Sequence, residues 1–493
     1  MSGNPGLPAS GQSTPGQSAA GPVHPGMRVL VHGLGRFGGG QEAVRFLARR
    51  GCHVRIADRS AGDDMLAVQK SMQDLPRSGA PDLDWQLGRE DEALLQGIDL
   101  FVANPGVPDH HPLLAAARKR GLPVTQEVDL FLSAYPGTVV AITGTNGKST
   151  TSTLLHAALA RSGQNTLLGG NIGHSLLADE ANWQKDQVAV LEISSFQLER
   201  LAQEQRVHGA VFTRVLKDHV DRHGTLAAYH TAKGRLATAA VDFVVHAADD
   251  PVAAAYASSA ARRVRFAATE PAPDSAGLLD GFLSVRLGQQ AAERIVHRDS
   301  LRLLGEFQWE NVMAASAAAR CLGAAPHAIG IAMATAAPLP FRLQLLAVIG
   351  GVRVYDNGVS TEIESTRSAL RTLSGPNGPA GPLHRVHWVG GGKSKDDDYA
   401  TVADGVVPHI AAAHLFGAAA KPLQAAIAGR RPVTAHTTLA EALTAAFAAA
   451  APGEVILFSP AFASFDQYPN FRARALEFHS WLASRRAQST AFG

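Results

Sequence analysis

Cysteine is nearly absent from this sequence, since Cys52 and Cys321 are the only two among 493 residues. Two isolated cysteines exclude a disulfide framework or a cysteine-based zinc site, and they favour a protein of the reducing cytoplasm. Strong net charge is also absent: the formal charge is +2, which gives no field to attract nucleic acid or an anionic membrane. No apolar run approaches the roughly 18 residues of a membrane-spanning helix. We therefore expect no nucleic-acid or membrane partner.

The first 26 residues lack all four charged side chains, Lys, Arg, Asp and Glu, and they contain no apolar block. A secretory signal needs a basic start followed by an apolar segment, so this stretch is not one. Gly, Pro and Ser at this density cannot build a core. We expect residues 1–26 to be a disordered tail.

From residue 27 onward, short apolar runs alternate with helical segments, which predicts parallel β-sheets with helices on both faces. Three sets of runs begin at MRVLVHGLG, GTVVAITGTNGKST and VRVYDN. Proline-containing segments separate them, near Pro136 and between Thr335 and Phe341. The sequence thus predicts three α/β domains: a Rossmann-like domain over 27–136, a central phosphate-loop domain over 137–337, and a Rossmann-like C-terminal domain over 338–493.

A glycine-rich turn, GLGRFGGG, follows the first apolar run and precedes a helix. Glycines there let the backbone approach a pyrophosphate at a helix N-terminus, and Asp58, at the end of the next strand, can hold a ribose or base. The spacing of the third glycine is only approximate. A dinucleotide site, typical of an oxidoreductase, and a turn without ligand are both open at this point.

A second glycine turn, AITGTNGKSTT, has the outline of a nucleotide phosphate loop, although Ile142 stands where the usual G-x-x-x-x-G-K-[ST] pattern has a glycine. Its glycines and Lys148 can surround the β- and γ-phosphates with N–H groups, and Ser149 or Thr150 can offer a hydroxyl to Mg²⁺. A plain strand-to-helix turn is the alternative.

Three further features follow in order. Glu192 ends the apolar run VAVLE, where a carboxylate at the carboxyl end of a parallel strand can hold Mg²⁺. KDHVDRHG places Asp218 and His219 together after another run, and Lys233 lies on the helix that follows. Taken singly, Glu192 is as readily a surface glutamate and the Asp-His loop as readily a solvated acidic turn, while a surface lysine is the default interpretation of Lys233. Their spacing lets one α/β domain bring them to the phosphate loop.

On these motifs the chain resembles the Mur ligase family, the ATP-dependent amide-forming enzymes of peptidoglycan precursor synthesis. TGTNGKSTT is that family's own phosphate loop, which lacks the upstream glycine there too. SSFQLE and SPAFASFDQYPNF are the most specific matches; GLGRFGG, NPGV, GGNIG, DHVDRHG with YHTAK, and FRLQ extend the resemblance over all three domains. Within the family it is most similar to the branch that adds D-glutamate to UDP-N-acetylmuramoyl-L-alanine in the cytoplasm.

The resemblance implies roles for particular side chains. Residues implied to hold the UDP-linked substrate, in place of a nicotinamide, are Gly33, Leu34, Gly35, Arg36, Phe37, Asp58, Arg59, Asn104, Gly106, Asn171, Ser194 and Gln197. Those implied to bind ATP are Gly144, Thr145, Asn146, Gly147, Lys148, Ser149, Thr150, Asn311 and Arg342. Two Mg²⁺ ions would be held by Ser149, Glu192, His219 and a lysine carbamylated by CO₂, Lys233. The amino acid would contact Thr361, Lys393, Ser464 and Phe471.

The implied reaction joins two small molecules through an acyl phosphate. The alanine carboxylate attacks the γ-phosphate of ATP, and the amine of glutamate then displaces phosphate. Lys148, Arg342 and the two Mg²⁺ ions would offset the repulsion between anions, and Asp218 or His219 would take a proton from the amine. The resemblance implies a monomer.

The chain departs from the family pattern in three places. Val359, in DNGVSTE, replaces a lysine of the usual Asn-Asp-Ser-Lys-Ala-Thr-Asn; Phe307 replaces the histidine of an adenine-side His-Asn pair; and Phe341 replaces the histidine before the arginine. The lost cation leaves the amino acid open. We expect D-glutamate, with L-glutamate or another amino acid as the alternative, and a relative that binds nucleotide without catalysis as a further one.

Overall fold

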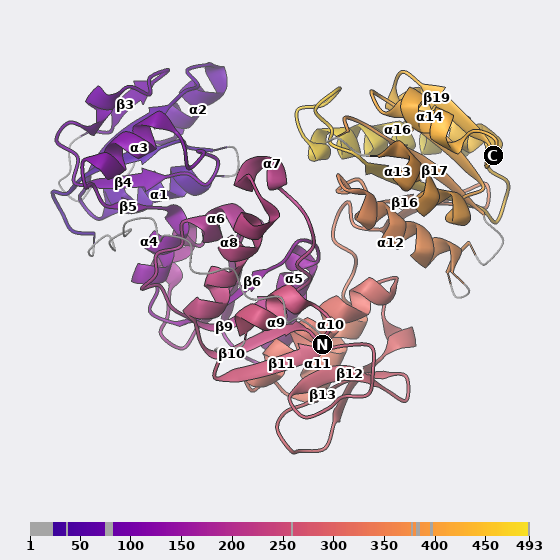
Figure 1. Cartoon of the computed structure of the whole chain (residues 1–493), viewed down its shortest axis with the longest axis horizontal. Helices are drawn as coiled ribbons and strands as arrows, with labels where there is room; N and C mark the ends of the chain where they lie inside the picture. Colours follow the sequence, from indigo (N-terminus) through magenta and orange to yellow (C-terminus); the bar gives the residue numbers. More distant parts are fainter. Residues whose placement is uncertain are drawn as a thin grey trace, which may run out of the picture. The chain divides into compact units, whose positions relative to one another are not determined.

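The computed structural model describes residues 23–35, 38–73, 82–257, 260–375, 378–380, 385–394 and 398–491, with their side chains except at 221 and 487–491. They form three β-sheets flanked by helices (Figure 1). The first two sheets belong to one compact unit, Met1–Val296 with Asn311–Ala332, and the third to another, His297–Glu310 with Met333–Gly493. The expected α/β class with three sheets is confirmed, while the exact domain limits stay a prediction. The expected tail lies outside the described residues except for 23–26.

The first sheet is parallel, in the order β3-β2-β1-β4-β5, and is covered on both faces. Val29 and Val31 pack in one core with α1 and α4, whereas Leu30 packs in another with α3, because successive strand residues face opposite sides. Its strands are β1 (Arg28–His32), β2 (His53–Asp58), β3 (Asp84–Leu87), β4 (Leu100–Ala103) and β5 (Val124–Thr125). Its helices are α1 (Gly39–Arg49), α2 (Asp63–Ser71), η1 (Glu92–Leu95), α3 (Pro112–Lys119) and α4 (Glu127–Ala134).

The second sheet has the order β14-β13-β12-β11-β10-β9-β6-β8-β7. Because β9, β6 and β8 are parallel neighbours, the segments that follow them meet at one edge. The strands are β6 (Thr138–Thr143), β7 (Thr166–Gly170), β8 (Val188–Glu192), β9 (Val207–Phe212), β10 (Ala240–Ala247), β11 (Arg262–Phe266), β12 (Ser275–Leu279), β13 (Phe282–Arg286) and β14 (Glu293–His297). The helices are α5 (Lys148–Arg161), η2 (Leu176–Asn182), α6 (Ser195–Glu199), α7 (Val220–His223), α8 (Leu226–Ala239), α9 (Pro251–Ala257), α10 (Glu306–Cys321) and α11 (Pro326–Thr335).

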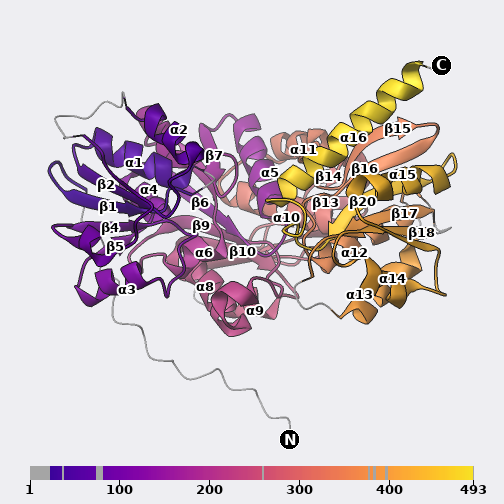
Figure 2. The same cartoon turned by 90° about the horizontal axis from the view of Figure 1, so that it is seen from above.

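The third sheet has the order β15-β16-β20-β17-β18-β19 and lies between two helical layers. Figure 2 shows α15 and α16 on one side of its strands and α12, α13 and α14 on the other, in agreement with two separate cores. The strands are β15 (Gln344–Ile349), β16 (Val352–Asp356), β17 (Val386–Gly391), β18 (Ala412–Phe416), β19 (Val433–His436) and β20 (Val455–Ala461). The helices are η3 (Arg298–Ser300), α12 (Ile363–Ser374), α13 (Tyr399–Val406), η4 (Val407–His409), α14 (Ala420–Ile427), α15 (Leu439–Ala449) and α16 (Phe471–Ala491).

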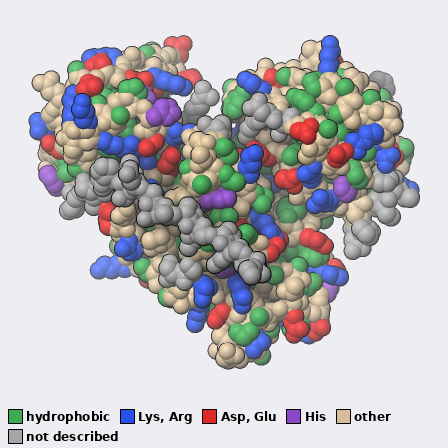
Figure 3. Space-filling model, viewed as in Figure 1, with side chains coloured by type: hydrophobic (Ala, Val, Ile, Leu, Met, Phe, Trp, Pro, Cys, Tyr) green, Lys and Arg blue, Asp and Glu red, His purple; other side chains and the backbone are tan. Residues whose placement is uncertain are grey.

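Two antiparallel additions were not expected from the sequence. β12 pairs with β13, and β15 pairs with β16, in antiparallel register. Within the described part of the chain, no helix combines the length and apolarity that a membrane crossing requires. On the face drawn in Figure 3, basic and acidic side chains are interspersed, as the small net charge suggests.

Two carboxyl groups of α4 are buried inside the first unit. Ser175 donates a short hydrogen bond to Glu127, and Ala202 donates its N–H to Asp129. Burial raises the pKa of each carboxyl to about 7. In the folded state both groups therefore hold a proton over a pH range in which the unfolded chain has released it.

This burial predicts that thermal stability falls as the pH rises from the ordinary Glu pKa of 4.5 to about 7. Across that range the folded state binds more protons than the unfolded state, so the free energy of unfolding decreases, by on the order of 3 kcal/mol for Glu127. Glu127→Gln should unfold at a higher temperature than the wild type at about pH 8 and show a flatter pH dependence. Equal pH slopes for the two proteins in thermal unfolding would contradict the prediction.

Candidate functional site

The turn between β6 and α5 is a preorganised phosphate loop. Gly147, with φ of 84°, precedes the first residue of α5, and a Cβ there would collide with Asn311 Oδ1. Gly144 likewise leaves no room for a Cβ beside Thr213. Lys148 bends back over the loop and donates from Nζ to the carbonyls of Gly144, at 3.0 Å, and Thr145, at 2.8 Å. The loop thus gathers a cation and the N-terminus of a 14-residue helix at one point, as an anion requires.

Side chains from the neighbouring strand connection hold this loop. Thr145 receives a hydrogen bond from the N–H of Leu216 at 2.9 Å, and its hydroxyl lies 2.8 Å from the Tyr229 hydroxyl. Asn146 pairs with Arg214 as an isolated antiparallel bridge. Ser149 and Thr150, both buried, lie in the first turn of α5. Sequence reasoning did not single out Tyr229, although it stands in the YHTAK segment that carried the resemblance.

Lys233 is fully buried on α8, where a surface lysine was the ordinary alternative. Its Nζ donates to the carbonyl of Gly144 at 2.8 Å and lies 4.8 Å from the centre of the Tyr229 ring. Burial, reinforced by the charge of Lys148, lowers the pKa of Lys233 well below its usual 10.5, against the opposing effect of Asp218 and Glu192. Burial thus disfavours the charged form of this amine.

Glu192 ends β8 and is also buried. Its Oε1 accepts a hydrogen bond from Asn171 Nδ2 at 2.9 Å, while Oε2 has no hydrogen-bond partner among the described residues. A buried carboxylate oxygen without a partner is costly unless a cation binds it. The carboxylate of Glu192 and the hydroxyl of Ser149, which follows the neighbouring strand β6, offer oxygen ligands. Such ligands fit a hard divalent cation such as Mg²⁺.

Asp218 and His219 form a tight corner after β9. His219 has φ of 49° and precedes α7; its N–H donates to Asp218 Oδ1 at 2.8 Å, and the two side chains lie 3.2 Å apart. The ring of His219 lies 4.9 Å from that of Phe196, on α6. The charges of Asp218, Glu192 and Lys148 all act on Lys233. The structure thus brings three predicted catalytic groups, Lys148, Asp218 and Lys233, and the predicted metal ligand Glu192 into one electrostatic neighbourhood.

The predicted UDP-site residues of the first sheet gather around its glycine turn. Asp58 accepts the N–H of Leu34 and of Ser60, each at 2.9 Å. A Cβ on Gly35 would lie 2.7 Å from Asn104 Nδ2, so the glycine allows the two strand connections to approach. Asn104 also accepts the N–H of Gly106 at 2.9 Å.

Two further predicted UDP-site positions of this sheet, Arg36 and Phe37, lie outside the described residues. Arg59 is exposed after β2. The turn is therefore described only in part, but the groups on either side of it are close together.

Two arginines that sequence reasoning missed hold the NPGV connection from the second sheet. Arg200, only 3% exposed, donates to the carbonyls of Asn104, at 3.1 Å, and Val107. Arg222 donates to Pro105 O at 3.1 Å and to Val107 O at 3.0 Å. The only signal in the sequence is that Arg200 directly follows SSFQLE.

Ser194 and Gln197 were expected to contact substrate, but in the structure they bond to each other. Ser194 Oγ accepts the N–H of Gln197, and Gln197 Oε1 accepts the N–H of Ser194 at 2.8 Å, which is a capping box at the start of α6. Their substrate contact stays a prediction.

Arg342, in the second unit, stands between two residues in the left-handed region. Phe341 has φ of 66° and Leu343 has φ of 49°, and such non-glycine conformations cost about 1–3 kcal/mol each. Val359 donates its N–H to Phe341 O at 3.2 Å, which joins two of the segments that depart from the family pattern. Strain of this kind concentrates at functional positions.

The predicted amino-acid residues are linked by one buried arginine that sequence reasoning also missed. Lys393 pairs with Ala463, the residue before Ser464, as an isolated antiparallel bridge. Arg474, 0% exposed, donates to Phe462 O at 2.9 Å, to Gly391 O at 3.3 Å and to Ser360 O at 3.4 Å. It therefore connects the three segments that precede Thr361, Lys393 and Ser464. Phe471 starts α16 and contacts Phe341, with ring centres 6.4 Å apart.

Asp356, three residues before the position where Val359 replaces a lysine, pairs with a histidine of another element. Asp356, at the end of β16, is 0% exposed, and its Oδ2 lies 2.7 Å from His479 Nε2 of α16. The ring of Phe341 lies 5.2 Å from that of His479. An imidazole from another element thus stands beside the carboxylate of the altered DNGVSTE motif.

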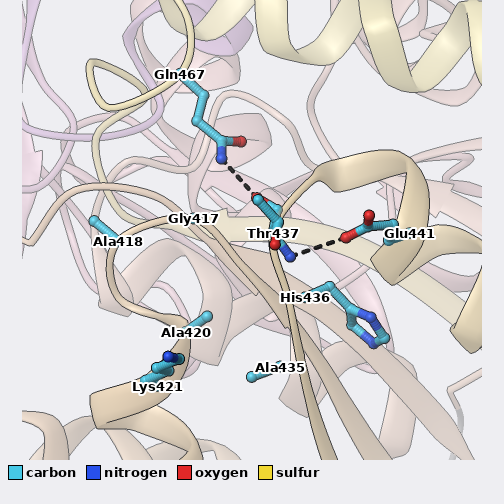
Figure 4. Close-up of a pocket in the computed structure, with 9 residues that line it drawn as sticks. All are labelled: Gly417, Ala418, Ala420, Lys421, Ala435, His436, Thr437, Glu441 and Gln467. Atoms are coloured by element: carbon cyan, nitrogen blue, oxygen red, sulfur yellow. Dashed lines mark hydrogen bonds between the residues drawn. The ribbon is translucent and has the colours of Figure 1, made fainter.

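A pocket of about 430 Å³ opens at the carboxyl ends of β18 and β19 (Figure 4). Gln467 donates to Thr437 O at 2.7 Å, and Thr437 donates its N–H to Glu441 at 2.9 Å across its wall. Its lining residues are Gly417, Ala418, Ala420, Lys421, Ala435, His436, Thr437, Glu441 and Gln467. None of the four predicted amino-acid residues lines it, although Gln467 follows Ser464 closely.

Models of three protein domains match successive parts of the chain. They are the Mur ligase MurD-like N-terminal domain over residues 27–126, the Mur ligase middle domain over 142–319 and the Mur ligase glutamate ligase domain over 341–462. The UDP-N-acetylmuramoylalanine–D-glutamate ligase of Acidobacterium capsulatum is 34% identical over 465 residues, covering 94% of this chain and 97% of that protein. The enzyme of the same name from Solibacter usitatus is 34% identical over 455 residues, covering 92% and 97%.

Solved structures have the same fold at lower identity. The UDP-N-acetylmuramate-alanine ligase MurC from Thermotoga maritima matches with a TM-score of 0.61 at 16% identity, covering 93% of this chain and 100% of that one. The MurF ligase from Thermotoga maritima, in complex with ADP, matches with a TM-score of 0.56 at 15% identity, covering 94% and 96%. Since the three domain models match in order and the curated relatives match over nearly their full length, the chain belongs to the Mur ligase family.

Proposed function

We propose that this protein joins D-glutamate to UDP-N-acetylmuramoyl-L-alanine with the consumption of ATP, in cytoplasmic peptidoglycan precursor synthesis. The observation that carries the proposal is the similarity, over 97% of their length, to relatives that bear the name of this ligase. Lys148 at the phosphate loop supports it, because acyl-phosphate chemistry needs a cationic group there, and the carboxylate of Glu192 can hold a divalent cation. ATP, UDP-N-acetylmuramoyl-L-alanine and glutamate are the proposed small-molecule partners, and the proposed state is a monomer.

The side chains of the second sheet divide the work of the first step. Lys148 would hold the γ-phosphate while the alanine carboxylate attacks it, and Arg342 would add positive charge to the same phosphate. Glu192, Ser149 and His219 would hold two Mg²⁺ ions, which when bound offset the negative charge of the phosphates. In the second step, Asp218 or His219 would take a proton from the attacking amine.

Lys233 would complete this set as a carbamate. A neutral amine attacks CO₂, forms an N–C bond and releases a proton. The product is an anionic carbamate in place of the amine. The low pKa of Lys233 supports this step, since only the neutral amine reacts. Lys233 lies beside the carboxylates of Glu192 and Asp218, so its carbamate would add a third oxygen ligand for a cation.

L-Glutamate or another amino acid remains the second candidate for the acceptor, because Val359 replaces a lysine. The names of the curated relatives favour D-glutamate. Membership of the Mur ligase family argues against a nicotinamide-dependent oxidoreductase, and the retained Lys148, Glu192 and Lys233 argue against a relative without catalysis.

The function is tested by ADP release from the purified protein with UDP-N-acetylmuramoyl-L-alanine, ATP and Mg²⁺. We expect release that requires an amino acid and is fastest with D-glutamate, when L-glutamate, aspartate and lysine are run beside it. Lys148→Ala should lower the rate by roughly 100-fold or more. No ADP with any amino acid would contradict the ligation, and preference for L-glutamate would correct the acceptor.

Carbamylation is tested with isotopically labelled bicarbonate. We expect one carbamate signal by nuclear magnetic resonance in the wild type, its loss in Lys233→Ala, and a fall in kcat of roughly 100-fold or more in that variant. Lys217→Ala, which changes an exposed lysine of the same strand connection, serves as the matched control and should keep both signal and activity. A carbamate signal that survives in Lys233→Ala would contradict the assignment.

Arg474 is proposed as a positioning residue for the amino-acid loops. Arg474→Lys keeps the charge but loses the planar fork that joins three carbonyls, so we expect KM for the amino acid to rise about tenfold while KM for ATP stays unchanged. Arg472→Lys, at an exposed neighbour, should change neither constant. Equal rises in both KM values for Arg474→Lys would indicate general loss of structure and contradict the positioning role.

A further inference from the structure

Three side chains with metal-ligating atoms converge at the carboxyl edge of the first sheet, in a different domain from the phosphate loop. His32 is the last residue of β1, Glu90 follows β3, and His111 precedes α3. Their potential ligand atoms all lie within 4.8 Å of one another. Glu90 Oε1 lies 3.1 Å from His32 Nε2 and 3.5 Å from His111 Nε2.

His32 occupies a position that an apolar residue would ordinarily fill. It is 1% exposed, and its ring lies against Phe101 with centres 5.7 Å apart. Its Nδ1 has no hydrogen-bond partner among the described residues. A buried ring nitrogen without a hydrogen-bond partner is unfavourable, so packing alone does not explain this histidine.

Two of the three spacings between these groups fit a tetrahedral transition-metal ion, and the third is at most 4.8 Å. With bonds of about 2.1 Å, ligand atoms of a tetrahedral zinc site lie roughly 3.4 Å apart, and the two distances to Glu90 bracket that value. The rings of His32 and His111 are tilted by 56° with centres 4.8 Å apart, so they converge on the carboxylate rather than stack. The negative charges of Glu90 and Asp58 act on His32, which favours a cation beside it.

Metal binding would change two existing hydrogen bonds, the one between His32 Nε2 and Glu90 Oε1 at 3.1 Å and the cap of α3. His111 Nδ1 accepts the N–H of Leu113 at 3.3 Å as the cap of α3. A metal on Nε2 requires the proton on Nδ1, so this cap would be lost, at a cost of about 1 kcal/mol. That cost is small beside the affinity of a site with two imidazoles and a carboxylate.

We propose that His32, Glu90 and His111 bind one divalent transition ion of the Zn²⁺ class, with a coordination position left open. Two imidazole nitrogens and one carboxylate are the ligand set of such ions, whereas Mg²⁺ prefers oxygen ligands alone. The site stands on the first sheet and does not depend on the ligase activity proposed for this protein.

The test is a titration of the metal-stripped full-length protein with Co²⁺ in excess Mg²⁺, followed by displacement with Zn²⁺. Co²⁺ on a tetrahedral site of this kind gives intense visible absorption bands, whereas a hexa-aqua ion or an octahedral oxygen site gives only weak ones. We expect one equivalent to bind with these bands, and Zn²⁺ to abolish them and raise the Tm. Glu90→Gln and His111→Ala should each weaken binding by about tenfold or more.

His110→Ala provides the matched control, because His110 is the exposed neighbour of His111 and should bind as the wild type does. His32→Leu places an apolar side chain in the buried position, so the metal-free variant should unfold no earlier than the metal-free wild type while its response to Zn²⁺ disappears. Absence of the absorption bands in the wild type would overturn the proposal. So would equal affinities of the wild type, Glu90→Gln and His111→Ala.

Discussion

The amine of Lys233 is buried, 2.8 Å from a carbonyl of the phosphate loop, and strand ends of the second sheet are arranged around it. A charged ammonium at this depth is unfavourable, and burial lowers its pKa well below 10.5. The charged groups that act on it come from three parallel strands: Lys148 after β6, Glu192 at the end of β8 and Asp218 after β9. Because parallel neighbours end at one edge, the sheet order brings a cation and two carboxylates together, and α8 adds the amine.

Buried arginines hold loops within each of the two units. Arg200 fixes the NPGV connection of the first sheet, and Arg474 fixes three segments of the third sheet through their carbonyls. Burial lowers the pKa of Arg474 to about 10, so the guanidinium stays charged at neutral pH. A guanidinium has five N–H donors in a fixed plane, so one side chain can join several loops that share no sequence contact. Each arginine thereby holds the carbonyls of several loop segments in fixed positions.

Much of the fold could be predicted from the sequence, because buried parallel strands read as continuous apolar runs and each was followed by a helical segment. The apolar runs of MRVLVHGLG, GTVVAITGTNGKST and VRVYDN appear as β1, β6 and β16. The antiparallel strands β12, β13 and β15 escaped notice since half-buried strands carry a weaker signal. In the site, the phosphate-loop glycines could be predicted from their motif, and Glu192 from its position at the end of an apolar strand. The pairing of Asp356 with His479 and the capping role of Ser194 were not, because they depend on which elements meet.

In the proposed reaction, the substrate carboxylate attacks ATP and an acyl phosphate is formed as the intermediate. The most direct measurement uses UDP-N-acetylmuramoyl-L-alanine whose alanine carboxylate carries a heavy isotope of oxygen, with ATP, D-glutamate and unlabelled water. The account predicts that each phosphate released with product contains one labelled oxygen, because the carboxylate oxygen that bonds to phosphorus leaves with it. Phosphate without label would show that water, not the carboxylate, attacks ATP, and would contradict the account.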